Sequence, residues 1–314
     1  MTKKIYVLTL SPALDYILKF DDFKKGKTNR PITTDIYAAG KGIHVSMMLN
    51  VLNQDNESII FINGLMESFF LNDLNKSKIN YKKFNSAQNI RINLKIIDDS
   101  QTEASAKAPA IISTEIDKLK WYLDEVLTKN DVLIISGSSP DNLGNYIYKE
   151  LGAIANKNTA LLVIDSFGVL LLNSLTEKPF LIKPNLEELE TTLNVKINND
   201  EDLISAANKL IQLGTQNVLV SKGNKGAILI TKDKVFSASI PKTIFKLNNA
   251  AGAGDSMLAG FIQKFIETND FEKSFKTSIL CGSATAYSER IADAKMIEMI
   301  NKFENTINIK IIDK

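Results

Sequence analysis

Short apolar runs rich in β-branched residues alternate with helical patterns along most of this chain. In the helical segments apolar residues recur every three or four positions, as at Val45, Met48, Leu49 and Leu52. Alternating strands and helices predict a mostly parallel sheet with helices on both faces, and such sheets bind ligands at the carboxyl ends of their strands. The predicted strands are Ile5–Leu10, Ser58–Ile62, Val132–Ser136, Ala160–Ile164, Phe180–Ile182 and Val218–Ser221.

Two stretches break this alternation, because pairs of strand-like segments follow one another there without a helix. The first pair spans residues 14–20 and 31–38, and the second pair spans residues 89–97 and 102–106. They predict a small antiparallel sheet apart from the main one, which is either a lid over the active site or an incidental β-extension. No repeat or flexible linker divides the chain, so residues 1–314 are expected to form one domain, with the lid built from about 12–38 and 88–108.

The composition limits the partners that this chain can bind. The 314 residues include 38 basic and 36 acidic ones, and this near balance predicts no surface for nucleic acid. A single cysteine, Cys281, and a single histidine, His44, exclude a His/Cys zinc site, and the apolar neighbours of Cys281 indicate a buried thiol. No apolar run reaches the length of about 18 residues that spans a bilayer. A soluble, cytoplasmic protein without membrane contact is therefore expected.

The strongest local motif lies near the carboxyl end, where Ala251-Gly252-Ala253-Gly254-Asp255-Ser256 leads into an apolar helical pattern. Small side chains leave backbone N–H groups free to face an anion, and a helix N-terminus adds partial positive charge, so this segment predicts a phosphate site. Asp255 has two interpretations. It is either a helix N-cap, or a general base for a hydroxyl that attacks a phosphoryl group. The chain contains no Walker loop, and the motif lacks the third glycine of a dinucleotide fingerprint.

This segment resembles the carboxyl-terminal signature of the PfkB-type (ribokinase-like) carbohydrate kinases. Further stretches resemble the family in its own order along essentially the whole chain. They are Thr9-Leu10-Ser11-Pro12-Ala13-Leu14-Asp15, Gly40-Lys41-Gly42-Ile43-His44, Arg91-Ile92-Asn93-Leu94-Lys95, Ser136-Gly137-Ser138-Ser139-Pro140, Lys183-Pro184-Asn185-Leu186-Glu187-Glu188 and Ser221-Lys222-Gly223-Asn224-Lys225-Gly226. The resemblance implies a three-layer α/β/α sandwich with a mostly parallel central sheet and a small inserted β-sheet lid.

The resemblance also implies roles for individual residues. Asp255 would be the catalytic base, and the backbone around Gly252, Ala253 and Gly254 would hold the developing negative charge. A sugar phosphate would be bound by Asp15, Lys27, Gly40, Lys41, His44, Arg91 and Ser138. ATP would be bound by Lys183, Asn185, Ser221, Lys222, Gly223, Asn224, Lys225, Gly226 and Gly254. Asn185 and Glu188 would act on Mg²⁺ through water molecules.

Simpler structural interpretations accompany several of these roles. Asp15 could cap a turn, Lys27 could be a solvated charge, and Glu188 could be an exposed residue in the first turn of a helix. The segment from Ser221 to Gly226 could be a plain hairpin turn.

Two departures from the family's pattern fall on the sugar side. Ala39 stands where the family has a second glycine before Gly40, and His44 replaces an asparagine that contacts the sugar. The branch that acts on phosphorylated ketohexoses fits best, so the expected reaction converts fructose 1-phosphate and ATP into fructose 1,6-bisphosphate. The alternatives are phosphorylation of tagatose 6-phosphate, a weakly active or non-catalytic sugar-phosphate-binding relative, and a dinucleotide-binding oxidoreductase. Family members often pair through the lid, so a homodimer is a further expectation.

Overall fold

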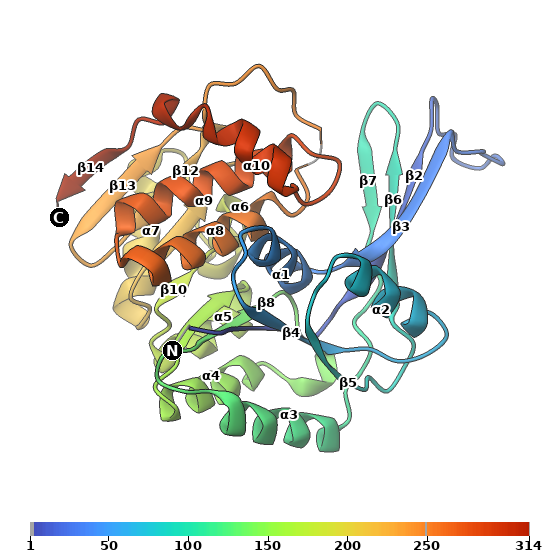
Figure 1. The fold of residues 1–314 in the computed structure, drawn as a ribbon, viewed down its shortest axis with the longest axis horizontal. Helices are drawn as coiled ribbons and strands as arrows, with labels where there is room; N and C mark the ends of the chain where they lie inside the picture. Colours follow the sequence, from blue (N-terminus) through green and yellow to red (C-terminus); the bar gives the residue numbers. More distant parts are fainter. Residues whose placement is uncertain (1–2, 249, 314) are drawn as a thin grey trace.

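The structure is a computed structural model that describes residues 3–248 and 250–313. Its described strands form one large and one small sheet, and the small sheet stands apart from the layered body in Figure 1. The strands of the large sheet, in spatial order, are β14 (Lys310–Asp313), β13 (Lys234–Ala238), β12 (Ala227–Ile230), β11 (Val218–Ser221), β10 (Leu181–Ile182), β9 (Leu161–Asp165), β8 (Val132–Ser136), β1 (Ile5–Thr9), β4 (Asn56–Phe61) and β5 (Tyr81–Phe84). Neighbours from β11 to β5 pair in parallel, while β12, β13 and β14 are antiparallel at one edge.

Every strand predicted for the main sheet is present, with ends within one or two residues of those expected. Strands β5, β12, β13 and β14 extend this sheet beyond the prediction. Strand β5 illustrates why an edge strand is hard to recognise. It is only four residues long, and its central residues are Lys82 and Lys83. Charged side chains are typical of sheet edges and hide the apolar pattern of a strand.

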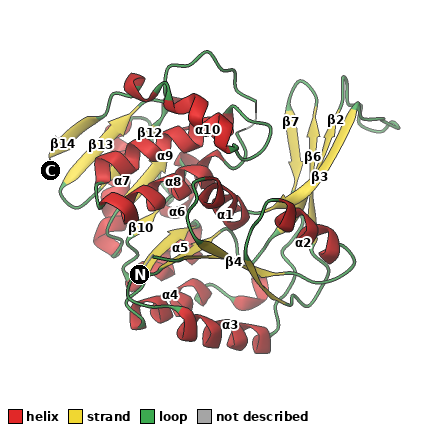
Figure 2. Cartoon of the chain, in the orientation of Figure 1, coloured by secondary structure: helices red, strands yellow, loops and turns green. Residues whose placement is uncertain are grey.

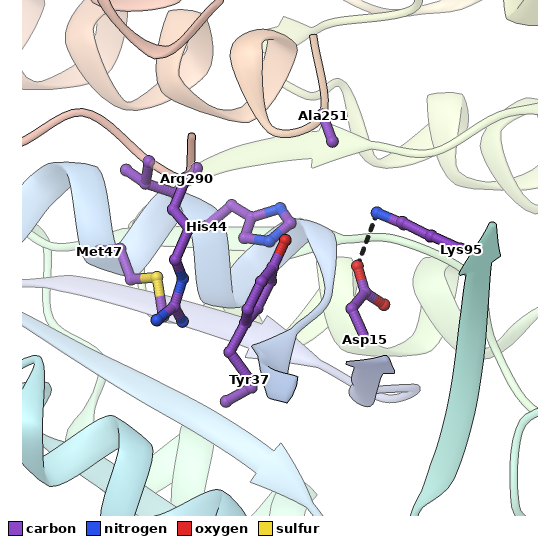
Figure 3. Close-up of a pocket in the computed structure, with 9 residues that line it drawn as sticks. Asp15, Tyr37, His44, Met47, Lys95, Ala251 and Arg290 are labelled. Atoms are coloured by element: carbon purple, nitrogen blue, oxygen red, sulfur yellow. Dashed lines mark ion pairs between the residues drawn. The ribbon is translucent and has the colours of Figure 1, made fainter. Parts of the chain in front are cut away.

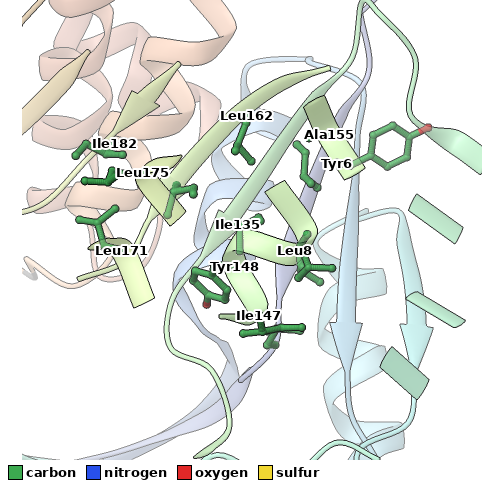
Figure 4. Close-up of a cluster of buried hydrophobic side chains, with 14 of the residues drawn as sticks. Tyr6, Leu8, Ile135, Ile147, Tyr148, Ala155, Leu162, Leu171, Leu175 and Ile182 are labelled. Carbon is green, nitrogen blue, oxygen red and sulfur yellow. The ribbon is translucent and has the colours of Figure 1, made fainter. Parts of the chain in front are cut away.

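Helices cover both faces of the large sheet, as Figure 2 shows. In β1, Tyr6 and Leu8 belong to one apolar cluster (Figure 4), whereas Ile5 and Val7 belong to a second cluster on the other face. Successive side chains of a strand point to opposite faces, so a strand covered on both sides is apolar throughout. The first cluster includes α3 (Ser113–Val126), α4 (Ile147–Lys157), α5 (Gly168–Ser174), α6 (Leu186–Leu193) and α7 (Asp200–Leu213). The second includes α1 (Lys41–Val51), α8 (Ala253–Thr268), α9 (Phe271–Ala286) and α10 (Ala294–Asn301).

A third cluster packs α2 (Glu67–Lys76) beside the edge of the large sheet. Phe70 and Leu74 of this helix are fully buried there with Ile60 and Ile62. Short 3₁₀ turns complete the described elements. They are η1 (Asp141–Leu143), η2 (Leu175–Glu177), η3 (Gly223–Lys225) and η4 (Glu304–Thr306). This architecture confirms the predicted α/β/α sandwich with a mostly parallel central sheet.

The small sheet contains β3 (Thr33–Ala39), β2 (Ala13–Lys19), β6 (Arg91–Ile97) and β7 (Gln101–Ala104), in that spatial order. Both hairpins were predicted, but the expectation of a purely antiparallel sheet is wrong. Strands β2 and β6 pair in parallel, with Ala13 opposite Arg91 and Lys19 opposite Ile97. Parallel strands need a long connection, and here the chain between them passes through α1, β4, α2 and β5 of the main body.

The thiol of Cys281 is buried in α9, as the sequence predicted. A β-carbon placed at Gly260 would lie only 2.7 Å from its Sγ atom, so α8 and α9 pack closely at this point. Burial raises the pKa of this thiol to about 12, which keeps it protonated and unreactive. Among the residues that the structure describes, none of the helices combines the length and the hydropathy that a membrane-spanning segment requires.

Candidate active site

A cleft with a volume of about 940 Å³ joins the small sheet to the carboxyl ends of the parallel strands. At the side that we call the sheet end, its walls carry Asp15, Arg91, Asn93 and Lys95. At the side that we call the loop end, its walls carry the residues after β11 and an apolar group. The apolar group consists of Ile240, Phe245, Leu247, Ile279, Ala286 and Tyr287. Gly252, Ala253, Gly254 and Asp255 line the same cleft.

Asp255 lies in the first turn of α8, but it is not the residue that caps this helix. The N-cap is Gly252, which has a φ angle of +79° that favours glycine, and no side chain caps the helix. The N-cap interpretation of Asp255 is therefore wrong. Its carboxylate is instead buried, and its Oδ2 atom lies 2.8 Å from Nδ1 of His44. A buried carboxylate at the positive end of a helix is suited to accept a proton beside bound phosphate.

Four charged side chains lie together at the ends of β9 and β10 and at the starts of α1 and α6. Lys41 donates to Glu188 Oε1 at 2.7 Å and to Asp165 Oδ1 at 3.3 Å. Lys183 Nζ lies 3.5 Å from the same Asp165 oxygen. A β-carbon at Gly254 would come within 3.1 Å of Lys183 Nζ, so glycine leaves room for this ammonium beside the helix. We call Lys41, Asp165, Lys183 and Glu188 the charged quartet.

Opposite charges within the quartet outweigh the effect of burial on the pKa values of Asp165 and Lys41. Burial alone would raise the pKa of Asp165, but Lys183 and Lys41 outweigh it and lower that pKa. Burial alone would lower the pKa of Lys41, but Asp165, Glu188 and Asp255 outweigh it and raise that pKa. Asp165 and Lys41 therefore remain charged at neutral pH. Asp165 was not among the predicted residues, although an aspartate at the carboxyl end of a buried parallel strand is a recognisable signal.

Asn185 and Glu188 form a capping box at the start of α6. The Asn185 side chain accepts from the Glu188 backbone at 2.8 Å, and Glu188 Oε2 accepts from the Asn185 backbone at 2.9 Å. The residues described here contain no cluster of three or more His, Cys, Asp or Glu side chains that could enclose a metal ion. Mg²⁺ usually keeps several waters and binds through one or two carboxylates together with phosphates. The donor set therefore fits a water-mediated magnesium site and not an all-protein cage.

The sheet end contains a buried ion pair. Lys95 Nζ lies 2.7 Å from Asp15 Oδ2, and Asn93 donates to Asp15 Oδ1 at 3.0 Å. Arg91 donates to the backbone oxygens of Ala106 and Ser11, each at 2.9 Å. Burial lowers the pKa of Arg91. The sequence analysis gave no role to Asn93 or Lys95. The available signal was their spacing, because residues two and four positions after Arg91 in a strand lie on the same face as Arg91.

The loop end is shaped by a tight turn after β11. The backbone N–H of Lys222 donates to the Gly226 carbonyl at 2.8 Å. Gly226 has a φ angle of +90°, and a β-carbon there would lie 2.0 Å from the Ala238 carbonyl oxygen, so only glycine fits. Nearby, the Phe245 and Tyr287 rings lie with their centroids 5.9 Å apart. The sequence analysis did not identify this apolar wall.

Most of the predicted site residues line this one cleft. They are Asp15, Gly40, Lys41, His44, Arg91, Lys183, Asn185, Glu188, Ser221, Lys222, Gly223, Asn224, Gly226, Gly252, Ala253, Gly254 and Asp255. Three predicted residues do not line it. Lys27 lies in the exposed loop between β2 and β3, Ser138 is exposed after β8, and Lys225 is exposed in η3.

Comparison with known proteins finds relatives that match this chain over nearly its full length. The 1-phosphofructokinase of Borreliella burgdorferi is 35% identical over 92% of this chain and 94% of that protein. The tagatose-6-phosphate kinase of Staphylococcus epidermidis is 30% identical over 91% of this chain and 93% of that protein. The crystal structure of Escherichia coli phosphofructokinase-2 in complex with fructose-6-phosphate superposes with a TM-score of 0.88 at 24% identity, covering 97% of this chain and 100% of that chain, and shows the shared fold.

The sequence pattern of the family described as "pfkB family carbohydrate kinase" matches residues 6–293. This match covers the cleft from β1 through α9. The chain belongs to the pfkB family of carbohydrate kinases.

Proposed function

We propose that this protein transfers the γ-phosphoryl group of ATP to a hydroxyl of a ketohexose phosphate, with fructose 1-phosphate as substrate and fructose 1,6-bisphosphate as product. The observation that carries the proposal is the position of Asp255. This buried carboxylate lies at the N-terminus of α8, in a cleft that also contains Arg91 and Lys95 at the sheet end and a glycine-rich loop end. The 35% identity to the 1-phosphofructokinase of Borreliella burgdorferi supports the choice of substrate.

In the proposed reaction Asp255 accepts the proton of the sugar hydroxyl. The hydroxyl oxygen forms a bond to the γ-phosphorus, and the bond from that phosphorus to the β–γ bridging oxygen breaks, which releases ADP. Backbone N–H groups at the start of α8, around Gly252 and Gly254, face the negative charge that develops on the transferred group. This arrangement stabilises the transition state mainly through position and charge, as phosphoryl transfer requires.

At the loop end, the turn from Ser221 to Gly226 would hold the nucleotide, and the wall containing Phe245 and Tyr287 would cover its base. Lys183 and Lys41 would face the phosphates. The sequence analysis gave Lys41 to the phosphate that the sugar carries. We assign it instead to the transferred phosphate, because it lies beside Glu188 and the nearby Asp255 helps to raise its pKa.

Glu188 and Asn185 would hold Mg²⁺ through water, and the bound ion would neutralise charge on the phosphates. Their side chains already orient one another through the capping box, so the Glu188 carboxylate is fixed in direction before any ion arrives. This arrangement suits a carboxylate that would hold the metal ion through a bridging water molecule.

At the sheet end, Asp15 would accept hydrogen bonds from the sugar hydroxyls. Arg91 and Lys95 would bind the phosphate that the sugar already carries, since a guanidinium and an ammonium both suit phosphate. The predicted roles of Lys27, Ser138 and Lys225 stay predictions, and so does the homodimer. The small sheet would act as the lid that excludes water during transfer.

The test is ADP release, measured by a coupled assay with ATP and Mg²⁺. The sugars would be fructose 1-phosphate, tagatose 6-phosphate, fructose 6-phosphate, fructose and ribose. A clear preference in kcat/KM for fructose 1-phosphate is expected. Preference for tagatose 6-phosphate would favour the alternative that the Staphylococcus epidermidis relative suggests. Turnover of free sugars alone would contradict the roles of Arg91 and Lys95. Binding without turnover would indicate a sugar-phosphate sensor.

A further inference from the structure

His44 makes a direct contact with the proposed base. It lies in the first turn of α1, and its Nδ1 atom is 2.8 Å from Asp255 Oδ2. The two side chains are largely buried, with 13% and 9% of their surface exposed. Gly252 allows the approach, since a β-carbon at this position would lie 3.3 Å from the imidazole Nδ1. The ring is therefore held against the carboxylate from the opposite helix.

We propose that His44 is a positioning residue for Asp255, and that its imidazole donates Nδ1–H to Oδ2. This inference rests on the proposed function of Asp255 as the base. One carboxylate oxygen is then fixed by the imidazole, and the other, Oδ1, remains directed to the sugar hydroxyl. A carboxylate that is fixed in this way cannot rotate away from the attacking group, which lowers the barrier to proton transfer.

The other side of the ring faces a small cavity of about 10 Å³, enough for one water molecule at most. Figure 3 shows the Tyr37 hydroxyl directed toward the His44 ring, with Arg290 alongside. The charged or titratable groups that face the ring are Asp255 from α8, Asp15 from β2, Tyr37 from β3, Lys95 from β6, Arg290 from the segment before α10, and Lys41 from its own helix.

Most of these charges are already paired with one another. Asp15 is bound to Lys95 at 2.7 Å, and Arg290 is bound to Asp73 at 3.1 Å while its guanidinium lies 3.9 Å from the Tyr37 ring centroid. Burial and the nearby Asp15 raise the pKa of Tyr37 to about 12, so its phenol keeps its proton. The Asp255 carboxylate is thus the charged group in direct contact with the imidazole.

The pairing predicts which side chains at position 44 can support Asp255. A side chain that donates a hydrogen bond from the position of Nδ1 keeps the carboxylate directed. An apolar side chain of similar size releases it.

The experiment compares kcat and KM for the wild type, His44→Asn and His44→Phe, with fructose 1-phosphate and saturating ATP–Mg²⁺. The asparagine amide can donate from nearly the same position as Nδ1, whereas phenylalanine cannot donate. We expect His44→Phe to lower kcat by about 10- to 100-fold with little change in KM, as part of the general-base contribution is lost. We expect His44→Asn to keep kcat within about three-fold of the wild type.

A matched control makes the result specific. Met47→Leu changes a neighbour on the same helix and the same small cavity, and it should leave kcat and KM unchanged.

The outcomes separate this inference from the proposed function. Equal kcat values in the wild type and His44→Phe, or an equal loss in His44→Phe and His44→Asn, would overturn the inference and leave the kinase assignment intact. An inactive wild type would overturn both. Should His44→Phe fail to fold, His44→Leu takes its place, because leucine is smaller and also cannot donate.

Discussion

The two ends of the cleft differ in how far their polar groups are satisfied by the protein itself. At the centre and loop end, Lys41 and Lys183 both form ion pairs with Asp165. Asn185 and Glu188 form a capping box there. At the sheet end, two buried polar atoms of the cleft wall lack a hydrogen-bond partner among the described residues. They are Arg91 Nε and Asn93 Oδ1. Buried polar groups without partners are costly, so they are expected to acquire partners when a ligand binds.

The charges at the two ends are balanced in the same way. The charged quartet balances two lysines with two carboxylates, and at the sheet end Asp15 and Glu103 face Lys95 and Arg91. Unpartnered polar atoms beside a guanidinium and an ammonium suit an anionic ligand with many hydroxyl groups. We infer that the phosphate-transfer end is organised before ligands arrive, and that the sugar end is completed by its ligand.

The largest expected effect is that of Asp255→Asn, because this change removes the base and keeps its shape. The amide can still face His44, and neither end of the cleft loses a binding group. We expect kcat to fall by about 10²- to 10⁴-fold with KM for both substrates within a few-fold. Steady-state kinetics on the purified variant would measure both. Near-normal turnover would show that Asp255 is not the base.

The next effect concerns stability at the organised end. Asp165→Ala leaves Lys183 buried without this carboxylate and removes one of the two partners of the half-buried Lys41, which costs about 3–5 kcal/mol of the free energy of unfolding. Urea unfolding would measure this loss. Asp124→Ala is the matched control, because it removes an exposed aspartate–lysine pair with Lys157 and should have a much smaller effect.

The same variant should change how stability depends on pH. The folded-state pKa of Asp165 is lowered, so its stabilising contribution is present at neutral pH. That contribution is lost as the pH falls from about 3.9, the ordinary value in an unfolded chain, through the lower folded value. The unfolding free energy of Asp165→Ala should therefore fall less steeply with acid than that of the wild type. Parallel curves would contradict the assigned charge state.

The organised end was also the more predictable from sequence. Its residues fall in contiguous motifs, such as Gly252 to Asp255 and Ser221 to Gly226, where local backbone needs dictate the residue types. The sheet end was predicted less completely, because its groups meet only through strand pairing. Asp15 faces Asn93 across β2 and β6, residues that lie 78 positions apart in the chain.

Two further features could not be derived from the sequence. The parallel pairing of β2 with β6 depends on how the intervening main-body elements return the chain, and no local pattern records that. The contact between His44 and Asp255 joins helices 211 positions apart. A histidine pattern alone does not reveal which of its neighbours in space will be a carboxylate.

A sheet-end variant, Lys95→Met, should weaken sugar binding and leave ATP binding unchanged. It removes a cation from the sugar side and leaves the buried Asp15 without its ammonium partner, so the free energy of unfolding should also fall. We expect KM for the sugar phosphate to rise by about 10- to 100-fold, since a hydrogen bond to a charged group contributes about 1.5–3 kcal/mol. KM for ATP should change by less than about two-fold. Lys83→Met, in the edge strand β5 and outside the cleft, is the control. If Lys95→Met raised the KM for the sugar phosphate and the KM for ATP equally, the distinction between the two ends would be lost.

The smallest effect compares two glycines with nearly the same backbone. Gly252 has a φ angle of +79° at the start of α8, and Gly26 has a φ angle of +77° in the exposed loop between β2 and β3. Alanine at either position adopts a left-handed conformation, which costs about 1–2 kcal/mol. At Gly26 nothing lies within 4 Å of the new β-carbon, so Gly26→Ala should lower stability alone.

At Gly252 the new β-carbon would also lie 2.5 Å from Ile291 Cδ1 and 3.3 Å from His44 Nδ1. Ile291 can move because the contact is the far end of its side chain, but the imidazole cannot shift without disturbing its contact with Asp255. Gly252→Ala should therefore match Gly26→Ala in urea unfolding to within about 1 kcal/mol, yet lose kcat by about ten-fold where Gly26→Ala loses none. Equal kcat values for the two variants would mean that the start of α8 tolerates a β-carbon at position 252. Transfer would then not require a glycine beside His44 and the bound phosphate.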